Sequence, residues 1–398
     1  MNTGKISYQE LYEAYLDCRK HKRNTMNALA FELDVEEKLL DLLYEINEGT
    51  YQIGRSVAFI VNRPVKREIF AAGFRDRIVH HLVVNKLNHL FERHFIYDSY
   101  SCRIGKGTHF GINRVNGFIR SCSQNYTKDC YVLKLDLKGF FMHINRTILW
   151  HKVESIINNY YFEGDKALLL SLCRQIIEND PTAQCVFKGG LQSWRGLPRD
   201  KSLFYSPYNC GLPIGNLTSQ VFANLYLTGF DHFVKSELKV RYYGRYVDDF
   251  VLVHENKHFL LYLIPIIQNY LNTKLHLDLH PKKIHLLHYT KGLKWLGAYI
   301  KPYRTCVIHR TKTNLYLSIM KSNDLVRSRR PEMEEIEHFV SSINSYFGLM
   351  RQFRTYRLRK KMFHRFSAYW YNHVYASGGY SKIVEKVKRV RYLNTFHN

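Results

Sequence analysis

The stretch Arg245-Tyr246-Val247-Asp248-Asp249-Phe250-Val251-Leu252-Val253 places two adjacent carboxylates between apolar, β-prone residues. Neighbours on a strand point to opposite faces, so a tight turn is one way for both carboxylates to reach one cluster. Adjacent acids in apolar surroundings repel each other and cost desolvation, and a bound divalent cation removes both penalties. Asp is also common in turns, so the alternative is an ordinary polar hairpin tip.

A third carboxylate, Asp136, stands at the end of the predicted strand Tyr131 to Leu135. Only tertiary folding could bring it to Asp248 and Asp249, because a long stretch of chain lies between them. Phosphoryl transfer by two metal ions uses sites about 4 Å apart. Mg²⁺ prefers oxygen ligands and keeps several waters, so a few carboxylates suffice. We therefore predict that these three aspartates are catalytic and hold two Mg²⁺ ions.

A glycine-containing loop, Gly211 to Gln220, lies between the two acidic motifs. Gly215 would allow the backbone to approach a ligand closely. Thr218 or Asn216 could cap the helix that follows. An ordinary loop-to-helix connection explains the same residues equally well.

The charge of the chain favours a polyanionic partner. Its 59 Lys and Arg exceed its 34 Asp and Glu, which gives a net charge of +25. Nucleic acid is the usual partner of such a surplus. An anionic membrane would call for a basic amphipathic helix or a lipidation signal, and neither is evident.

The remaining composition indicates a soluble, intracellular, globular protein. Hydrophobic residues make up 45% of the chain, and the apolar runs are too short to cross a bilayer. The first residues lack the apolar core of a signal peptide. The eight cysteines include no C-x-x-C pair, which favours reduced thiols over a metal or redox motif.

Periodicity and turn residues predict the main elements. Ser7 and Glu10 have the form of a capping box at the start of a first helix. Further helices are expected at 27–45, 75–95, 148–177, 217–238 and from Pro331 onward, with strands at 57–62, 66–70, 131–136 and within 241–254. Asp180 to Cys210 reads as a long loop or insertion, and a basic linker is expected before Pro331.

The order of these motifs resembles the palm of a reverse transcriptase. A strand aspartate with Phe140 and Phe141 after it, a glycine-containing loop entering a helix, and Tyr-x-Asp-Asp in a hairpin follow one another. Trp295-Leu296-Gly297 resembles the primer grip of that family. The resemblance covers roughly Val57 to Ile300 and extends more loosely over the tail.

The resemblance implies an α+β right-hand polymerase fold, with an antiparallel palm sheet packed on helices and a mainly helical thumb. The implied domains are an N-terminal helical extension at 1–56, fingers at 57–130, a palm at 131–300 with an insertion at about 180–210, and a basic helical thumb at 301–398. Accessory protein or RNA contact is open for the insertion.

The resemblance also implies roles for single residues. Phe141 would be the steric gate against a ribose 2′-hydroxyl, and Arg67 with Lys66 would reach the incoming triphosphate. Ile214 would lie beside the incoming nucleotide, where accurate relatives place Gln, so that Ile214 and Arg67 bear on fidelity. Gly215 and Gln220 complete the expected nucleotide site. Lys283 matches a proton donor to pyrophosphate only thinly, and the alternative is a solvated lysine.

The loop Ile214-Gly215-Asn216-Leu217-Thr218-Ser219-Gln220 resembles the reverse transcriptases of diversity-generating retroelements, where intron and retroviral enzymes tend to carry Pro-Gln-Gly. These systems copy a template RNA with errors opposite adenine, and the cDNA replaces a variable region of a target gene. The implied partners are template RNA, the cDNA or primer strand, target DNA, dNTPs and a small basic helical-bundle accessory protein, in the cytoplasm of a prokaryotic or phage-infected cell.

Two alternatives stay open. One is an intron-type or defence-associated reverse transcriptase, and the other is a non-catalytic RNA-binding protein with a polymerase fold. The basic tail predicts salt-sensitive RNA binding. The alternative is that the tail is merely a solvated helical face. The expected RNA contacts of the tail are Arg351, Arg354, Arg357, Arg359, Lys360 and Lys361. Arg103 and Lys106 lie in a segment that resembles one in the fingers or palm of the family, which implies contact with the template backbone.

Overall fold

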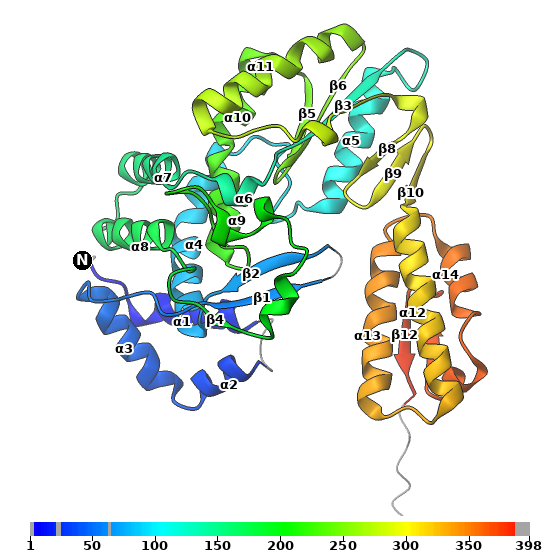
Figure 1. Ribbon diagram of the computed structural model, residues 1–398, viewed down its shortest axis with the longest axis horizontal. Coiled ribbons are helices and arrows are strands. Elements are labelled where there is room, and N and C mark those ends of the chain that lie inside the picture. Colours follow the sequence, from blue (N-terminus) through cyan, green and yellow to red (C-terminus); the bar gives the residue numbers. More distant parts are fainter. Residues whose placement is uncertain (1–3, 21–24, 63–64, 387–398) are drawn as a thin grey trace, which may run out of the picture. The chain divides into compact units, whose positions relative to one another are not determined.

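The computed structural model describes residues 4–20, 25–62 and 65–386 and divides the chain into two compact units, Met1–Leu286 and Leu287–Asn398 (Figure 1). Helices and antiparallel sheets occur in both units, so the predicted α+β class is confirmed. The strands after residue 287 fall in the second unit, together with the helices that follow them.

The elements of the first unit alternate between helices and short strands. Its helices are α1 (Tyr8–Arg19), α2 (Met26–Glu32), α3 (Val35–Asn47), α4 (Phe74–His94), α5 (Thr108–Cys122), α6 (Phe140–His143), α7 (Arg146–Tyr160), α8 (Lys166–Glu178), α9 (Leu217–Tyr226), α10 (Thr228–His232) and α11 (Lys257–Leu275). Its strands are β1 (Val57–Val61), β2 (Arg67–Ala71), β3 (Tyr131–Asp136), β4 (Val186–Phe187), β5 (Tyr242–Tyr246) and β6 (Asp249–His254), and β7 (His285–His288) follows.

The central sheet has the order β5-β6-β3-β7, and β6 runs antiparallel to both β5 and β3. Four consecutive residues of β6, Phe250 to Val253, are fully buried. Side chains alternate between the faces of a strand, so both faces of the sheet are covered. Helices α5 and α11 pack against β6, while α4 packs on α9. This apolar support fixes the ends of β3 and β6, where the acidic residues lie.

The N-terminal helices begin as predicted but divide differently. Ser7 accepts a hydrogen bond from the backbone N–H of Glu10, and the Glu10 carboxylate accepts one from Ser7, which completes the capping box. The single helix predicted at 27–45 is wrong, because α2 ends at Glu32 and α3 starts at Val35. Asp34 stands at the N-cap of α3 with φ −131°, outside helical geometry, and so interrupts the helix.

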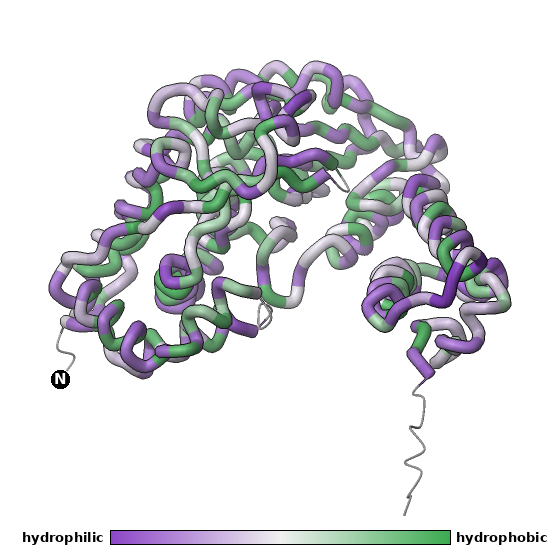
Figure 2. Tube along the Cα trace, turned by 60° about the horizontal axis from the view of Figure 1, so that its bottom comes forward, coloured by the Kyte–Doolittle hydropathy of each residue, from purple (hydrophilic) through white to green (hydrophobic). Residues whose placement is uncertain are grey.

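Two longer helices were also predicted where the chain makes shorter ones. The stretch 148–177 forms α7 and α8 with a turn between them, and 217–238 forms α9, α10 and a π-helical turn at Phe233–Glu237. Hydrophobic periodicity continues across such breaks, because each piece buries the same side against the core. Figure 2 shows hydrophobic and hydrophilic residues alternating along the chain.

The insertion at about 180–210 is not only a loop. Its strand β4 runs parallel to β1, and β1 pairs with β2 in the predicted hairpin. Three short 3-10 turns follow, at Leu191–Trp194, Arg199–Lys201 and Leu203–Tyr205. The insertion thereby extends the hairpin into a three-stranded sheet with the order β2-β1-β4.

The second unit has a core of its own. Its elements are β8 (Leu293–Trp295), β9 (Ala298–Lys301), β10 (Arg304–Val307), α12 (His309–Ser328), α13 (Met333–Met350), α14 (Tyr356–Phe363), β11 (Val374–Ser377) and β12 (Lys382–Glu385). The predicted basic linker before Pro331 is wrong, since α12 occupies it. Leu315, Ile319 and Val326 of α12 are buried in one cluster with Phe339 and Phe347 of α13. Within the described ranges no helix is both long and apolar enough to cross a membrane.

Candidate active site

Three carboxylates meet at the edge of the central sheet. Asp136, the last residue of β3, pairs in register with Asp249, the first residue of β6. Asp248 occupies the turn between β5 and β6, and its carbonyl oxygen accepts a hydrogen bond from Leu137 N–H at 3.2 Å. The structure therefore brings together the three aspartates that the sequence singled out.

The turn that carries Asp248 is strained. Tyr246 pairs with Asp249, so Val247 and Asp248 form a two-residue connection. Val247 has φ +55°, which is unfavourable for a β-branched residue. Such a conformation costs about 1 to 2 kcal/mol, and it persists because the surroundings impose it. Arg245 Nη1 donates a hydrogen bond to the Val247 carbonyl at 3.0 Å, which stabilises the turn.

The carboxylates raise each other's proton affinity. The pKa of Asp248 rises to about 7, chiefly because the group is buried and also because Asp136 and Asp249 are negative. Burial likewise raises the pKa of Asp136, which the hydrogen bond from Lys283 partly offsets. A site that disfavours its own negative charge in this way favours a bound cation.

Two lysines supply positive charge to this cluster. Lys283 Nζ donates a hydrogen bond of 2.7 Å to Asp136 Oδ1, and Lys134 Nζ lies 3.0 Å from Asp249 Oδ1. Lys283 is thus ion-paired with Asp136, while 46% of its side chain remains exposed. Its expected role as a proton donor stays a prediction.

The donor chemistry of the site fits a hard divalent cation. Three carboxylates, two from adjacent strands and one from the turn beside them, offer oxygen ligands, as Mg²⁺ prefers. In the part of the chain that the structure describes, no three His, Cys, Asp or Glu side chains are already arranged around a metal position. Asp136 is ion-paired with Lys283, and Asp249 with Lys134.

The hairpin of β1 and β2 carries two expected nucleotide contacts, Arg67 and Lys66. Arg67 is exposed at the start of β2. Burial raises the pKa of the Tyr246 hydroxyl, and the positive charge of Arg67 offsets part of that rise, so Arg67 lies near the end of β5. Lys66 Nζ instead donates to the carbonyl of Arg195 at 2.7 Å, which ties it to the insertion.

Phe141 and Ile214 border the same apolar cluster, and their expected roles stay predictions. Both are half-buried and pack against a cluster that includes Phe70. The Ile214 carbonyl accepts a hydrogen bond from Phe70 N–H at 2.9 Å, so the loop is bonded to β2. At Gly215, which has φ +130°, a Cβ would lie 2.8 Å from Cγ2 of Ile69. Only glycine fits this crossing of loop and strand.

Asn216 and Thr218, the expected helix caps, form hydrogen bonds to other parts of the fold instead. Neither Asn216 nor Thr218 caps α9 with its side chain. Asn216 Oδ1 accepts a hydrogen bond from Ala72 N–H at 3.1 Å, and Thr218 Oγ1 lies 2.8 Å from Nδ1 of the buried His80. These contacts join the start of α9 to β2 and α4. Gln220, the last residue of the loop motif, is exposed and accepts a hydrogen bond from the Cys102 thiol at 3.0 Å.

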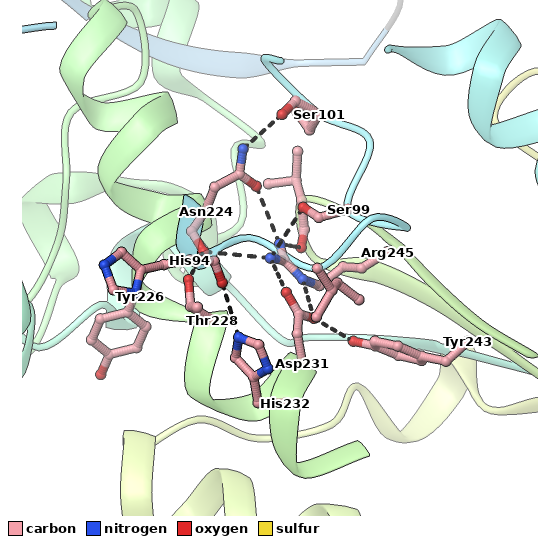
Figure 3. Close-up of polar contacts among 12 residues, drawn as sticks. His94, Ser99, Ser101, Asn224, Tyr226, Thr228, Asp231, His232, Tyr243 and Arg245 are labelled. Carbon is pink, nitrogen blue, oxygen red and sulfur yellow. Dashed lines mark hydrogen bonds and ion pairs between the residues drawn. The ribbon is translucent and has the colours of Figure 1, made fainter. Parts of the chain in front are cut away.

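A buried ion pair beside the turn that carries Asp248 was not predicted from the sequence. Arg245 and Asp231 are both fully buried, and Arg245 donates to the two carboxylate oxygens of Asp231 at 2.8 and 2.6 Å. Tyr243 donates to the same carboxylate at 2.7 Å, and Asn224 Oδ1 accepts from Arg245 at 3.2 Å. Figure 3 shows Arg245 at the centre of this network. A single charged residue within an apolar strand, as Arg245 is, was the available signal.

Some of the expected RNA contacts are committed to internal partners. The Arg103 side chain is 7% exposed, forms an ion pair with Glu92 and donates to the Ile96 and Ser99 carbonyls. Arg359 is buried and donates to the Tyr380 carbonyl. These bonds argue against RNA contact by either guanidinium.

Other expected RNA contacts remain accessible. Lys106 is half-buried, donates to the Tyr97 carbonyl and lies over the Tyr97 ring. The other expected contacts are exposed and stay candidates for RNA contact; they are Arg351, Arg354, Arg357, Lys360 and Lys361.

The expected primer grip is a tight hairpin turn in the second unit. Trp295 pairs with Ala298, so Leu296 and Gly297 form the two-residue loop between β8 and β9. Their φ angles are +45° and +84°, the combination that suits the twist of a hairpin. Trp295 is buried, whereas Leu296 and Gly297 are half-exposed at the tip.

Comparison with known proteins identifies a family. The family profile described as reverse transcriptase (RNA-dependent DNA polymerase) matches residues 66–300, more than half of the chain. That range includes the three aspartates and the expected nucleotide and primer-grip residues. No curated protein matches the sequence.

Solved structures with a similar arrangement include telomerases from Candida species. A telomerase from Candida albicans in complex with a TWJ fragment of telomeric RNA is 12% identical, with a TM-score of 0.48, over 81% of this chain and 64% of that chain. An apo telomerase from Candida tropicalis truncated from its C-terminal domain is 16% identical, with a TM-score of 0.45, over 63% and 54%. This chain thus spans 54% to 64% of the length of those two chains.

Proposed function

Because the chain belongs to the reverse transcriptase (RNA-dependent DNA polymerase) family, we propose that it is an error-prone RNA-directed DNA polymerase of a diversity-generating retroelement. The observation that carries the polymerase activity is the meeting of Asp136, Asp248 and Asp249 at the ends of β3 and β6. The same cluster argues against a non-catalytic RNA-binding protein, which would have no use for three mutually repelling carboxylates.

Asp136 and Asp248 would hold two Mg²⁺ ions, with Asp249 completing the ligand set. Magnesium would activate the primer 3′-hydroxyl and stabilise the leaving pyrophosphate. Arg67 offers a bidentate contact to the triphosphate, and Phe141 would exclude a ribose 2′-hydroxyl. The Val247 turn keeps Asp248 beside Asp136, so that little rearrangement is needed when substrate binds.

The error-prone subtype rests on Ile214. This side chain, like Phe141, packs at the edge of an apolar cluster, and it has no hydrogen-bonding group to offer a nascent base pair. A site without such contacts loses part of the energy that separates correct from incorrect pairs. Template RNA, cDNA, target DNA, dNTPs and a small basic accessory protein would be the partners, in the cytoplasm of a prokaryotic or phage-infected cell.

The test is primer extension on an RNA template with Mg²⁺, followed by sequencing of the cDNA. We expect errors concentrated opposite template adenines in the wild type and fewer errors in Ile214→Gln. Ile148→Gln, a half-buried isoleucine on α7, is the matched control and should leave the error pattern unchanged. Faithful copying of adenine by the wild type would overturn the subtype and favour an intron-type or defence-associated enzyme. Absence of extension would overturn the polymerase itself.

A further inference from the structure

The insertion between α8 and α9 presents aromatic rings and cations together on its surface. Phe187 and Phe204 stack at 5.8 Å between ring centroids, and Arg199 lies over the Tyr205 ring at 5.1 Å. The exposed fractions are 43% for Phe187, 39% for Phe204 and 61% for Tyr205. We define the insertion patch as Phe187, Lys188, Arg195, Arg199, Phe204 and Tyr205, all of which are exposed.

We propose that the insertion patch binds single-stranded RNA, which extends the proposed function by giving the template a second contact outside the catalytic centre. The proposal rests on that function for the identity of the RNA. It rests on the patch itself for the binding chemistry.

The patch is held rigidly enough to act as a platform. The buried Glu68 carboxylate accepts hydrogen bonds from Trp194 Nε1 at 2.7 Å, Ser202 Oγ at 2.8 Å and Leu203 N–H at 2.6 Å. The backbone of Lys188 donates to the Ala58 carbonyl at 2.9 Å, and β4 pairs with β1. Few rotamers or loop conformations would therefore have to be frozen on binding, which lowers the entropic cost.

The charge and shape of the patch favour RNA over a protein partner. From Asp180 to Cys210 the chain has four bases, Lys188, Arg195, Arg199 and Lys201, and two acids, Asp180 and Asp200. Cations meet phosphates, while exposed aromatic faces stack on bases. Bases in a duplex are already stacked on each other, so the rings can serve only unpaired nucleotides.

The position of the insertion puts such an RNA near the chemistry. The insertion shares a sheet with β2, whose first residue is Arg67. Its Asp200 carbonyl lies so close to Gly139 that a Cβ there would be 2.7 Å away, and Gly139 is three residues after Asp136. The insertion thus contacts both the nucleotide-binding hairpin and the loop after the catalytic strand. Unpaired template bound there would stay close to the site of synthesis.

The experiment measures binding of the full chain to a fluorescent oligo-uridine single strand by anisotropy, with a blunt RNA duplex as the second probe. The variant is Tyr205→Ala/Arg199→Gln, which changes two exposed side chains. The control is Tyr262→Ala/Lys257→Gln on α11, where Tyr262 is 66% exposed. We expect the patch variant to lose about tenfold in affinity for the single strand, within the effect of one lost stacking contact, while the control and duplex binding change less than twofold.

Two further measurements test whether stacking causes the binding and whether the polymerase is affected separately. Tyr205→Trp should retain single-strand affinity, because an indole stacks at least as well as a phenol. Extension of a primer over a one-nucleotide template overhang tests the polymerase separately and should be unchanged in the patch variant. Equal single-strand affinity of the patch variant and the control would overturn the proposal. The proposal would also be overturned if the patch variant lost binding to a protein partner but kept its affinity for RNA.

Discussion

The buried pair of Arg245 and Asp231 gives the sharpest prediction about stability. Arg245→Met would keep an apolar side chain of similar length in place but would leave the Asp231 carboxylate fully buried without its cation. Breaking a buried pair from one side typically costs about 3 to 5 kcal/mol. The loss of the hydrogen bonds to Asn224 and Val247 also falls within this change. We expect the free energy of unfolding of the first unit to fall by about 4 kcal/mol.

Urea unfolding followed by circular dichroism measures this quantity, and a double-mutant cycle identifies its source. Asp231→Asn removes the other charge, so Arg245→Met/Asp231→Asn should cost clearly less than the sum of the single changes. The free energy of unfolding of Arg245→Lys should lie between those of wild type and Arg245→Met, because an ammonium group cannot make the bidentate contact. A loss below about 1 kcal/mol for Arg245→Met would refute the reasoning, because that is the scale of an ordinary exposed pair. Additive single changes would refute it as well.

Three further changes have directions set by the structure. Gly215→Ala should lower the urea midpoint by the equivalent of about 1 to 3 kcal/mol, because its Cβ meets Ile69 and its φ is +130°; an unchanged midpoint would contradict this. The pKa of Asp248 is about 7 in the folded chain, above its ordinary value, so the folded state holds the proton more tightly than the unfolded state. Metal-free wild type should therefore gain stability relative to Asp248→Asn as the pH falls from about 8 to 5, and parallel pH curves would count against the carboxylate cluster. Burial lowers the pKa of His80 to about 3. In the same urea assay, wild type should therefore lose stability relative to His80→Gln as the pH falls below about 6.5. A stability difference that does not change with pH would show that His80 is not kept neutral.

The parts of the fold that the sequence predicted well are those with strong local signals. The alternating run before Asp136 and the apolar flanks of Asp248 and Asp249 predict strands, and the structure pairs them in register. Ser7 and Glu10 predict a helix start that the structure has. These elements depend on residues close in the chain, so periodicity and turn chemistry find them.

The rest depends on contacts between distant residues. Helix α12 has a polar, basic sequence and is stabilised by burying Leu315 and Ile319 against α13. The insertion owes its shape to Glu68, which lies more than a hundred residues earlier in the chain. No local pattern reports such a partner, so the sequence indicated only a loop.

The site shows the same division. The three aspartates were found by residue type and order. Arg359 was assigned to RNA from the charge of the tail, and Arg103 from the resemblance of its segment to one in the family. Both guanidiniums have internal partners at positions that only the fold reveals. The ion pair of Lys283 with Asp136 likewise depends on the tertiary fold, although the motif had already singled out the lysine.

The central claim is that Asp136, Asp248 and Asp249 form the metal-dependent centre of an RNA-directed DNA polymerase. The most direct test is single-turnover extension of a DNA primer by one nucleotide on an RNA template, over a Mg²⁺ titration, for wild type and Asp248→Asn. Asp41→Asn, an exposed aspartate on α3, is the control. We predict Mg²⁺-dependent extension by wild type and Asp41→Asn and a loss of at least about a thousandfold in Asp248→Asn, or about 4 kcal/mol of transition-state stabilisation. Extension by Asp248→Asn at a rate close to wild type would contradict the account.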